Sequence, residues 1–481
     1  MTARPRSVHT VSIIGGGFSG TLAAIKLINA ATQPLLVRII EPRTELGRGL
    51  AYSTRQSSHL VNGPAKLFGL HPDQPDHFTR WLADYGASWG WRDPLEPDYA
   101  NAFSPRWVLG LYVQAELAAA VAQAAPGVSL EHVVGEARDV WRNGDALSVA
   151  LGDGRVLVAD HVVLALGVFQ ARPQFSGDPS LLQSGRYIED PWNIPAYDAV
   201  PPDGEVALIG SGLTMLDAVV TLERRGFRGR YQVISRRGLL VQPRREVSPW
   251  RDFLAEGDLP RSVVALLHRI RRELASVRQA GADWQSLIAA IRPHVGALWQ
   301  GANETQRSRF LRHLRPFWEN AMHRAPGPSA RLLEEVRAAG RFVHRAARVL
   351  DLQFEPSGRV AVALRPRGSD VRVALSVDTA VNCTGAHYEW SQTGRRPLVA
   401  NLLRRGLVRP GPLAFGIDAD QHAAVIERDG AVSDQLSAIG PPLRGTRWES
   451  STNVELLQQA IALAARLDAA IPAPAETIAA A

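Results

Sequence analysis

A strand–glycine–helix pattern near the N-terminus constrains the fold of this chain more than any other feature. Apolar residues 11–14 lead into glycines spaced Gly-x-Gly-x-x-Gly, and a helical apolar pattern continues through 21–27. The first glycine allows a tight turn, the second lets a pyrophosphate approach the backbone, and the third lets helix and strand pack closely. Free amides and the helix dipole then face the phosphates. The predicted phosphate-binding residues are Gly15, Gly17, Phe18, Ser19 and Gly20.

A second apolar strand supports the same interpretation. Residues 35–40 lead to Glu41, which lies 21 positions after Gly20, where a carboxylate binds the ribose hydroxyls of an adenosine. The alternative, a glycine-rich turn that binds no ligand, is disfavoured because strand, glycines, helix, second strand and terminal acid occur together. Another glycine-rich loop follows at 47–53, and its Arg48 is a candidate cofactor contact.

The same theme returns about 195 residues later. A strand at 205–209 precedes a second glycine loop, in which Met215 replaces the third glycine, and a helix and a strand at 231–234 follow. An NAD site has an acid after that strand, whereas an NADP site has arginine, whose planar fork suits the 2′-phosphate. We therefore expect NADPH here; the alternative is an exposed arginine pair that binds nothing. The predicted contacts are Gly210, Gly212, Leu213, Thr214, Ser235, Arg236 and Arg237.

Two further strands end in glycine, at Gly167 and Gly385. In two-domain flavoproteins the chain crosses between domains at such strand ends, where glycine lets the backbone pass close to a cofactor. We expect an α/β fold with two Rossmann-like dinucleotide-binding domains, for FAD and NADP, and a helical insertion in the second. The predicted boundaries are 1–185 and 386–481 for the FAD-binding domain, and 186–385 for the NAD(P)-binding domain with its insertion at about 251–340.

The C-terminal region should complete the flavin site. Gly440 would lie against the isoalloxazine, and a helix from Asn453 would point its N-terminus at the flavin N1/O2 edge, where the dipole stabilises negative charge. The alternative is an ordinary capped helix after a proline loop.

Composition excludes several other classes. The chain has 481 residues, and 54 Lys+Arg against 47 Asp+Glu give a net charge of +7. No nucleic-acid-binding module accompanies that basic balance. The single cysteine, Cys383, rules out Cys-x-x-Cys chemistry and is typical of a protein of the reducing cytoplasm. No stretch has the length of a membrane span, and the thirteen histidines show no metal-ligand spacing, so we expect no metal.

The motifs together resemble the FAD/NAD(P)-binding family of bacterial flavoproteins, which is similar in layout to flavin-dependent monooxygenases, including amine N-hydroxylases. They run almost end to end: GGGFSG, GRGLAYST, HLVNGPAKLFGLHPDQPDHFTRWL, LALG, GSGLTMLD, SRRG, RFLRHLRPFW, NCTG and AIGPPLRGTRWESSTNVELLQQA. In such enzymes a segment like Pro64–Leu82 lies beside the flavin. The resemblance therefore implies Asn62, Lys66 and Asp73 as candidates for the flavin or substrate face.

Three functions remain open at this stage. The leading hypothesis is an NADPH-dependent monooxygenase that oxygenates a small molecule, such as an amine, with molecular oxygen through a flavin C4a-(hydro)peroxide. Because the flavin carries this chemistry, no catalytic dyad is needed. The second is an NADPH-dependent reductase that passes electrons to a partner or quinone, for which the basic aromatic insertion would be a docking face. The third is a flavin-binding scaffold without turnover. Substrate and oligomeric state stay undetermined.

Overall fold

Buried strands from both ends of the chain form the first sheet. The computed structural model describes residues 8–86, 88, 91, 98–170, 178–255, 259–390 and 396–472. The first sheet has the order β17 (Ala424–Ile426), β18 (Val432–Ala438), β7 (His161–Leu164), β1 (His9–Ile14), β2 (Leu35–Glu41), β3 (Val128–Val134). Its strands are parallel except for β17. The order reverses between β1 and β7, which is where ligands bind in open α/β sheets.

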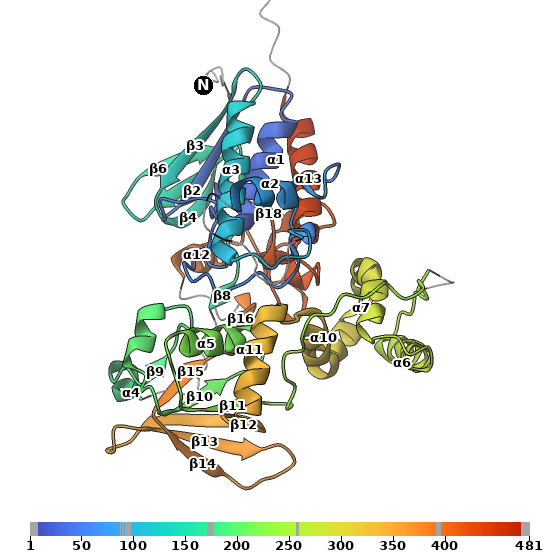
Figure 1. Cartoon of the computed structure of the whole chain (residues 1–481). Coiled ribbons are helices and arrows are strands. Elements are labelled where there is room, and N and C mark those ends of the chain that lie inside the picture. Colours follow the sequence, from blue (N-terminus) through green and yellow to red (C-terminus); the bar gives the residue numbers. More distant parts are fainter. Residues whose placement is uncertain are drawn as a thin grey trace, which may run out of the picture.

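Apolar side chains cover both faces of this sheet. The helices of one face are α1 (Phe18–Ala30), α3 (Arg106–Ala122) and α13 (Asn453–Ala470). The other face packs on a three-stranded antiparallel sheet of β4 (Ala137–Asn143), β5 (Ala146–Leu151) and β6 (Val156–Ala159), and on α12 (Pro397–Arg405). We call this assembly the first unit. It occupies the upper part of Figure 1.

The second unit repeats the plan with the middle of the chain. Its sheet has the order β14 (Val373–Val377), β13 (Val360–Pro366), β12 (Phe342–Phe354), β11 (Arg230–Ser235), β10 (Glu205–Ile209), β15 (Thr379–Asn382), β9 (Tyr187–Ile188). The five strands β12 to β9 are parallel, and β13 and β14 extend the sheet as an antiparallel meander. The covering helices are α4 (Pro179–Gln183), α5 (Leu213–Arg224) and α11 (Gly327–Ala338). The order reverses between β10 and β15, so both units have a switch point beside their glycine loop.

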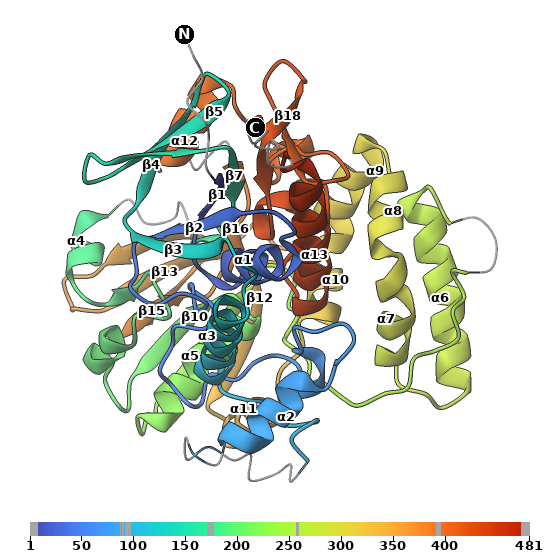
Figure 2. The ribbon, with the colours of Figure 1, turned by 90° about the horizontal axis from the view of Figure 1, so that it is seen from above.

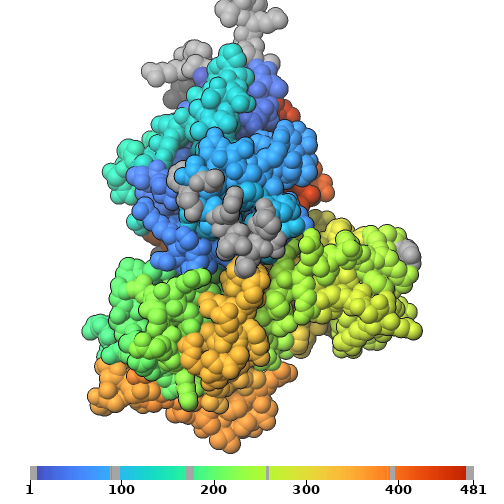
Figure 3. All heavy atoms as spheres, viewed as in Figure 1, coloured from blue at the N-terminus to red at the C-terminus, as the bar shows by residue number. Residues whose placement is uncertain are grey.

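A helical arm leaves the second unit after β11 and projects to one side (Figures 1 and 3). Its elements are α6 (Val263–Gln279), α7 (Gln285–Ile291), η3 (Arg292–His294), α8 (Val295–Gly301), α9 (Glu304–Arg309), the π-helical η4 (Phe310–Leu314) and α10 (Arg315–Met322). The expected insertion at about 251–340 also contained α11. That helix packs instead on α5 and serves as the crossover between the parallel strands β11 and β12.

The arm belongs to the second unit but also packs on the first unit. Trp299 and Phe310 lie against Trp448, and Trp448 stacks on Phe415. The Trp299 indole donates to the Gly445 carbonyl at 2.9 Å. Seen from above, the arm lies beside α13 (Figure 2). The aromatic side chains of the predicted docking face are therefore largely used inside the molecule.

The two crossings between units lie side by side. Phe169–Gln170 (β8) pairs antiparallel with Ala386–His387 (β16), just after Gly167 and Gly385. This pairing and the strand membership support the predicted domain boundaries, which stay a prediction; residues 171–177 and 391–395 lie outside the described ones. Among the residues that the structure describes, no helix is both long and apolar enough to cross a membrane.

Candidate cofactor and substrate site

The first glycine loop has little spare space. Gly15 has φ +108°, and a Cβ there would lie 2.3 Å from the Ala165 carbonyl oxygen. A Cβ on Gly20 would lie 1.9 Å from the Gly15 oxygen, so only glycine fits. A Cβ on Gly17 would come within 3.2 Å of Gly49, because the loop at 47–53 folds over the start of α1.

That loop also shapes the electrostatics of the first site. Helix α1 begins at Gly17 without a side-chain cap, so its first-turn amides, including those of Phe18 and Ser19, remain for a ligand. Glu41 is buried and accepts from the Gly16 amide at 2.9 Å. The Arg48 side chain is largely buried, its Nη2 lies 3.5 Å from Glu45, and its Nε has no partner among the described residues. A buried guanidinium with an unused donor fits a phosphate group.

The second glycine loop is built alike but is open. Gly210 has φ +120°, and a Cβ there would lie 2.1 Å from the Cys383 carbonyl oxygen, the counterpart of Gly15 and Ala165. Helix α5 begins at Gly212, again without a side-chain cap, and has Leu213 and Thr214 in its first turn. A Cβ on Gly212 would meet nothing within 4 Å. This free space is the cradle that a pyrophosphate requires.

The residues after β11 lie at the edge of this second loop. Ser235 Oγ is 3.0 Å from His344 Nε2, and Arg236 is exposed. Arg237 donates to the Arg312 carbonyl at 2.9 Å and lies 5.5 Å from the Phe317 ring centre. The arm thus holds one of the two predicted 2′-phosphate ligands in place and leaves the other free to reach a ligand.

The remaining predicted glycines also lie at the carboxyl ends of the sheets. Gly167 and Gly385 both have positive φ, and no atom lies within 4 Å of a Cβ built on either. Gly440, with φ +81°, packs on Ser19, because its Cβ would lie 2.7 Å from the Ser19 hydroxyl oxygen. The fold therefore brings Gly440 to the start of α1, from 421 positions away in the sequence.

A cavity of about 220 Å³ lies where the two units meet. It contains Asn62, one of the three residues implied by the resemblance. The first unit and the first crossing also supply Leu50, Ala51, Tyr52, Val61, Phe68, Arg106 and Val168, and the segment after β9 of the second unit supplies Trp192. Its lining is mainly apolar, with few polar groups, as is usual for cofactor and substrate sites. Burial raises the pKa of Tyr52 to about 12, and the nearby Arg106 guanidinium opposes this, so the phenol stays protonated at neutral pH.

Polar contacts across the interface fix the cavity walls. Arg106 pairs with Asp217 of α5 at 2.8 Å. His59 is fully buried and lies 2.8 Å from the Thr221 hydroxyl, also on α5. Burial lowers the pKa of His59, so this bridge is a neutral hydrogen bond. Sequence reasoning missed these contacts because the partners are more than 100 positions apart.

Lys66 and Asp73 do not line the cavity. The Lys66 ammonium is instead 2.7 Å from the Asn101 side-chain oxygen and 2.9 Å from Glu246 of the second unit. Asp73 is exposed and belongs to the turn that leads into α2 (His77–Gly86), where it faces Lys26.

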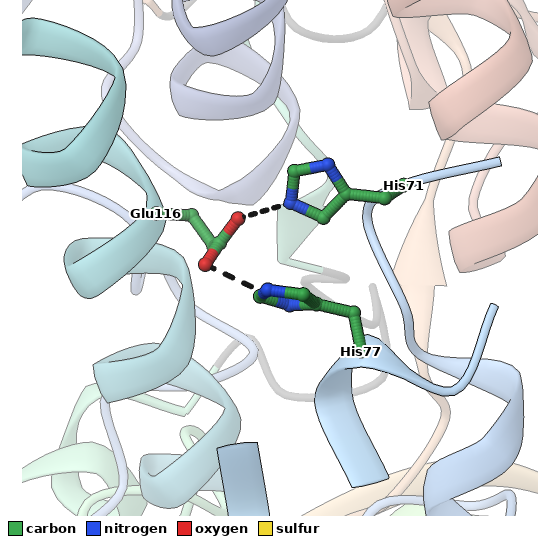
Figure 4. A group of neighbouring side chains, drawn as sticks. All are labelled: His71, His77 and Glu116. Atoms are coloured by element: carbon green, nitrogen blue, oxygen red, sulfur yellow. Dashed lines mark hydrogen bonds and ion pairs between the residues drawn. The ribbon is translucent and has the colours of Figure 1, made fainter. Parts of the chain in front are cut away.

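That turn is fastened to α3 by a cluster of ionisable side chains (Figure 4). Glu116 is buried; its carboxylate lies 2.5 Å from His71 Nε2 and 3.8 Å from His77 Nδ1. Two histidines and a glutamate are a ligand set that Zn²⁺ accepts, and their ligand atoms lie within 4.8 Å of one another. However, the Tyr112 hydroxyl is 2.9 Å from His77 Nδ1, and the Lys26 ammonium interacts with Glu116. These partners satisfy the cluster as a hydrogen-bond network that anchors the turn. No ligand spacing in the sequence marks this cluster.

The lone thiol takes no part in this site. Cys383 follows β15 and is buried, which raises its pKa, so it stays protonated and unreactive.

Comparison with known proteins agrees with this geometry. Residues 12–169 match the sequence profile of the FAD-NAD(P)-binding family, which confirms the predicted cofactor-binding domain. Curated protein sequences contain no significant match. Among solved structures, the chain is similar to ornithine N-hydroxylase from Kutzneria sp. 744, at 14% identity and a TM-score of 0.63, over 96% of this chain and 99% of that one.

Two further structures show the same end-to-end likeness. One is the reduced ornithine hydroxylase of Pseudomonas aeruginosa, at 17% identity and a TM-score of 0.63, over 96% and 99% of the two chains. The other is the FAD-bound cadaverine monooxygenase of Erwinia amylovora, at 12% identity and a TM-score of 0.65, over 95% and 94%. The chain therefore contains an FAD-NAD(P)-binding region and has, over its described length, the two-unit Rossmann fold of these flavoproteins.

Proposed function

We propose that this chain is an FAD- and NADPH-dependent monooxygenase that transfers one oxygen atom of O₂ to a small molecule, with an amine as the favoured class. One observation carries the proposal: each unit has a glycine loop at the switch point of its sheet, and the cavity residue Arg106 pairs with Asp217 of α5, the helix that follows the second loop. The likeness to N-hydroxylating monooxygenases over nearly the whole chain supports the choice of reaction.

The two loops have different roles in this proposal. We assign FAD to the first, because Glu41 follows its second strand and the loop at 47–53 closes over it. We assign NADPH to the open second loop, with Arg236 and Arg237 as ligands of the 2′-phosphate. Bound FAD would supply the redox chemistry that links NADPH to O₂. For an amine, NADPH, a proton, O₂ and the amine give NADP⁺, water and the hydroxylamine.

The residues of the chain orient the reactants and exclude water. The ties of His59 and Arg106 to α5 hold the two units at a fixed distance. The apolar cavity walls keep water from the reaction, and Asn62 offers a polar contact there. The single buried cysteine supports a location in the reducing cytoplasm, which we also propose.

The test is isotopic. The purified, FAD-loaded chain is screened with small amines and amino acids for NADPH-dependent oxygen uptake, and products formed under ¹⁸O₂ are weighed by mass spectrometry. We expect one ¹⁸O atom in the product. Electron transfer to a quinone without oxygen incorporation would identify a reductase instead. Bound flavin without NADPH oxidation in the presence of any candidate would leave only a binding function.

A further inference from the structure

Three arginines converge where the arm meets the two units. Arg244 lies on the segment after β11, Arg292 lies in η3, and Arg324 lies just before α11. The Arg244 amide donates to the Ala325 carbonyl at 2.9 Å, so these two segments run together. Gln285 ties them further, donating to the Pro243 carbonyl and accepting from Arg324 Nη1, at 2.8 and 2.7 Å.

Only one of the three has a carboxylate partner among the described residues. Arg292 is bound by Glu455 of α13, with three N···O distances of 3.1–3.2 Å, and donates to Thr452. Arg324 is 9% exposed; it binds the neutral Gln285, and its Nε has no partner. Arg244 has one long hydrogen bond, to the Asn62 carbonyl at 3.4 Å. The nearby Asp283 is itself held by Arg245 at 2.6 Å.

Arg244 and Arg324 therefore contribute about two positive charges that no carboxylate balances, in a partly buried environment. Burial and the guanidiniums of Arg324 and Arg292 lower the pKa of Arg244 to about 10. Burial also lowers the pKa of the adjacent His323, so that imidazole adds no charge at neutral pH. Buried charges without counter-ions destabilise a fold, which makes such an arrangement costly unless an anion completes it.

We propose that Arg244 and Arg324 form an anion site that binds a doubly negative group of the substrate, either a phosphate or a pair of carboxylates. The site adjoins the cavity, because Asn62 both lines the cavity and accepts from Arg244. Guanidinium groups bind such anions in bidentate fashion. The inference rests on the proposed function, in that the bound molecule is the one oxygenated. It narrows the substrate to an organic dianion, which the anion site would hold next to the cavity.

The test measures binding without turnover, so it does not depend on oxygenation. The FAD-loaded full chain is titrated calorimetrically with inorganic phosphate and with succinate, at constant ionic strength set with sodium chloride. We expect at least one dianion to bind, and Arg324→Gln and Arg244→Gln to weaken it about tenfold or more, since a charged hydrogen bond is worth about 1.5–3 kcal/mol. Binding of phosphate would indicate a phosphate group on the substrate, and binding of succinate would indicate a pair of carboxylates.

Arg271→Gln is the matched control, because this arginine lies on α6 of the same arm and is exposed. If Arg271→Gln weakens dianion binding as much as Arg324→Gln and Arg244→Gln do, the proposed anion site is wrong. So would loss of phosphate binding in the double variant Arg236→Ala/Arg237→Ala but not in Arg324→Gln, because the anion would then sit in the coenzyme site. Absence of any dianion binding also refutes the proposal.

Thermal unfolding separates binding from a purely structural role. In anion-free buffer, Arg324→Gln should unfold at or above the temperature of the unchanged protein, because an unpaired buried charge is removed. Phosphate or succinate should raise the unfolding temperature of the unchanged protein more than that of the variant. A variant that is less stable in every buffer and equally stabilised by the anion would contradict the proposal. If Arg324→Gln does not fold, dianion affinity and unfolding temperature are both measured on Arg244→Gln, because Arg244 is only half-buried.

Discussion

The two glycine loops have the same backbone plan but differ in what surrounds them. In both, the first glycine lies against a carbonyl of the neighbouring strand end, Ala165 in one case and Cys383 in the other. The first loop is covered by the segment around Gly49, whereas the space at Gly212 is empty. A covered loop suits a cofactor that stays bound through turnover, and an open loop suits one that must leave after each cycle.

The third position shows why the sequences could diverge. Gly20 lies so close to the Gly15 carbonyl that no side chain fits. At the equivalent place α5 has Met215, which is fully buried in the core of the second unit. The start of the second helix therefore accommodates a side chain at its third position and keeps only the two glycines that the turn and the phosphate need.

The largest effect should come from filling the closed loop. Gly20→Ala would place a methyl group 1.9 Å from a backbone oxygen, so we expect loss of bound FAD and a destabilisation of about 3 kcal/mol. Gly212→Ala, the matched change, meets no atom within 4 Å and should keep both fold and flavin while raising the KM for NADPH. Flavin absorbance after desalting and unfolding temperatures would check both. Equal flavin loss in the two variants would remove the distinction between the loops.

The next effect concerns the coupling of the units. Asp217→Asn leaves Arg106 half-buried without its carboxylate, which should cost about 3 kcal/mol and split calorimetric unfolding into two transitions. Glu223→Gln is the control, since it breaks a similarly buried pair with Arg341 inside the second unit. It should lower stability without uncoupling the units. A single transition in Asp217→Asn would show that other contacts suffice for coupling.

A smaller effect should distinguish the coenzymes. Replacing Arg236 and Arg237 by alanine should raise the KM for NADPH about 10- to 100-fold and that for NADH far less, because only NADPH has the 2′-phosphate. Arg230→Ala, at the exposed start of the same strand, serves as control. Steady-state kinetics would give the KM for each coenzyme. Equal increases for NADPH and NADH would contradict the assignment of NADPH to the second loop.

Acid should weaken the first unit through His161. This side chain lies in β7, 2.8 Å from the Ser437 hydroxyl, and burial lowers its pKa to about 3. The unfolded histidine has a pKa near 6.5, so the unfolded state binds more protons between the two values and stability falls as pH falls. At pH 5 the loss is about 2 kcal/mol. In the variant His161→Asn, the unfolding free energies at pH 7 and pH 5 should differ less than in the unchanged protein. An equal difference in both proteins would show that His161 does not cause the acid destabilisation.

The smallest effect is expected at the thiol beside the second loop. Cys383 is buried with a raised pKa, so thiol reagents should label it only after unfolding. Cys383→Ala should cost about 1 kcal/mol and leave the coenzyme constants unchanged, since only the backbone carbonyl contacts Gly210. Rapid labelling of the native protein would mean that the loop opens widely.

Local patterns predicted most of the elements. The strand expected at 205–209 has those bounds, the strand expected at 231–234 lies within β11, and the last helix begins at Asn453 as expected. Apolar periodicity and the positions of glycines are local features, so they can be recognised without knowledge of the fold. The long strand β12, Phe342–Phe354, is not among the predicted strands, because its charged residues interrupt the apolar pattern on a sheet that is partly exposed.

The site was predictable only where a motif marks it. Asn62 lines the cavity, whereas Lys66 and Asp73, the other two residues that the resemblance implies, do not. Arg106 and His59 carried no sequence signal, because each pairs with a residue of the distant helix α5. Trp192 carried none either, because it meets the other cavity residues only in the folded chain.

The sequence by itself predicted two Rossmann-like units and the different charges that follow their second strands, Glu41 in one and Arg236 and Arg237 in the other. Glycine spacing and the residue after a strand are local requirements of backbone geometry and charge. Tertiary structure alone decided that one loop is covered and the other open, and that Arg244 and Arg324 share an unbalanced charge beside Asn62. The reason is physical: packing distance and desolvation depend on which distant segments meet, and no local pattern records that.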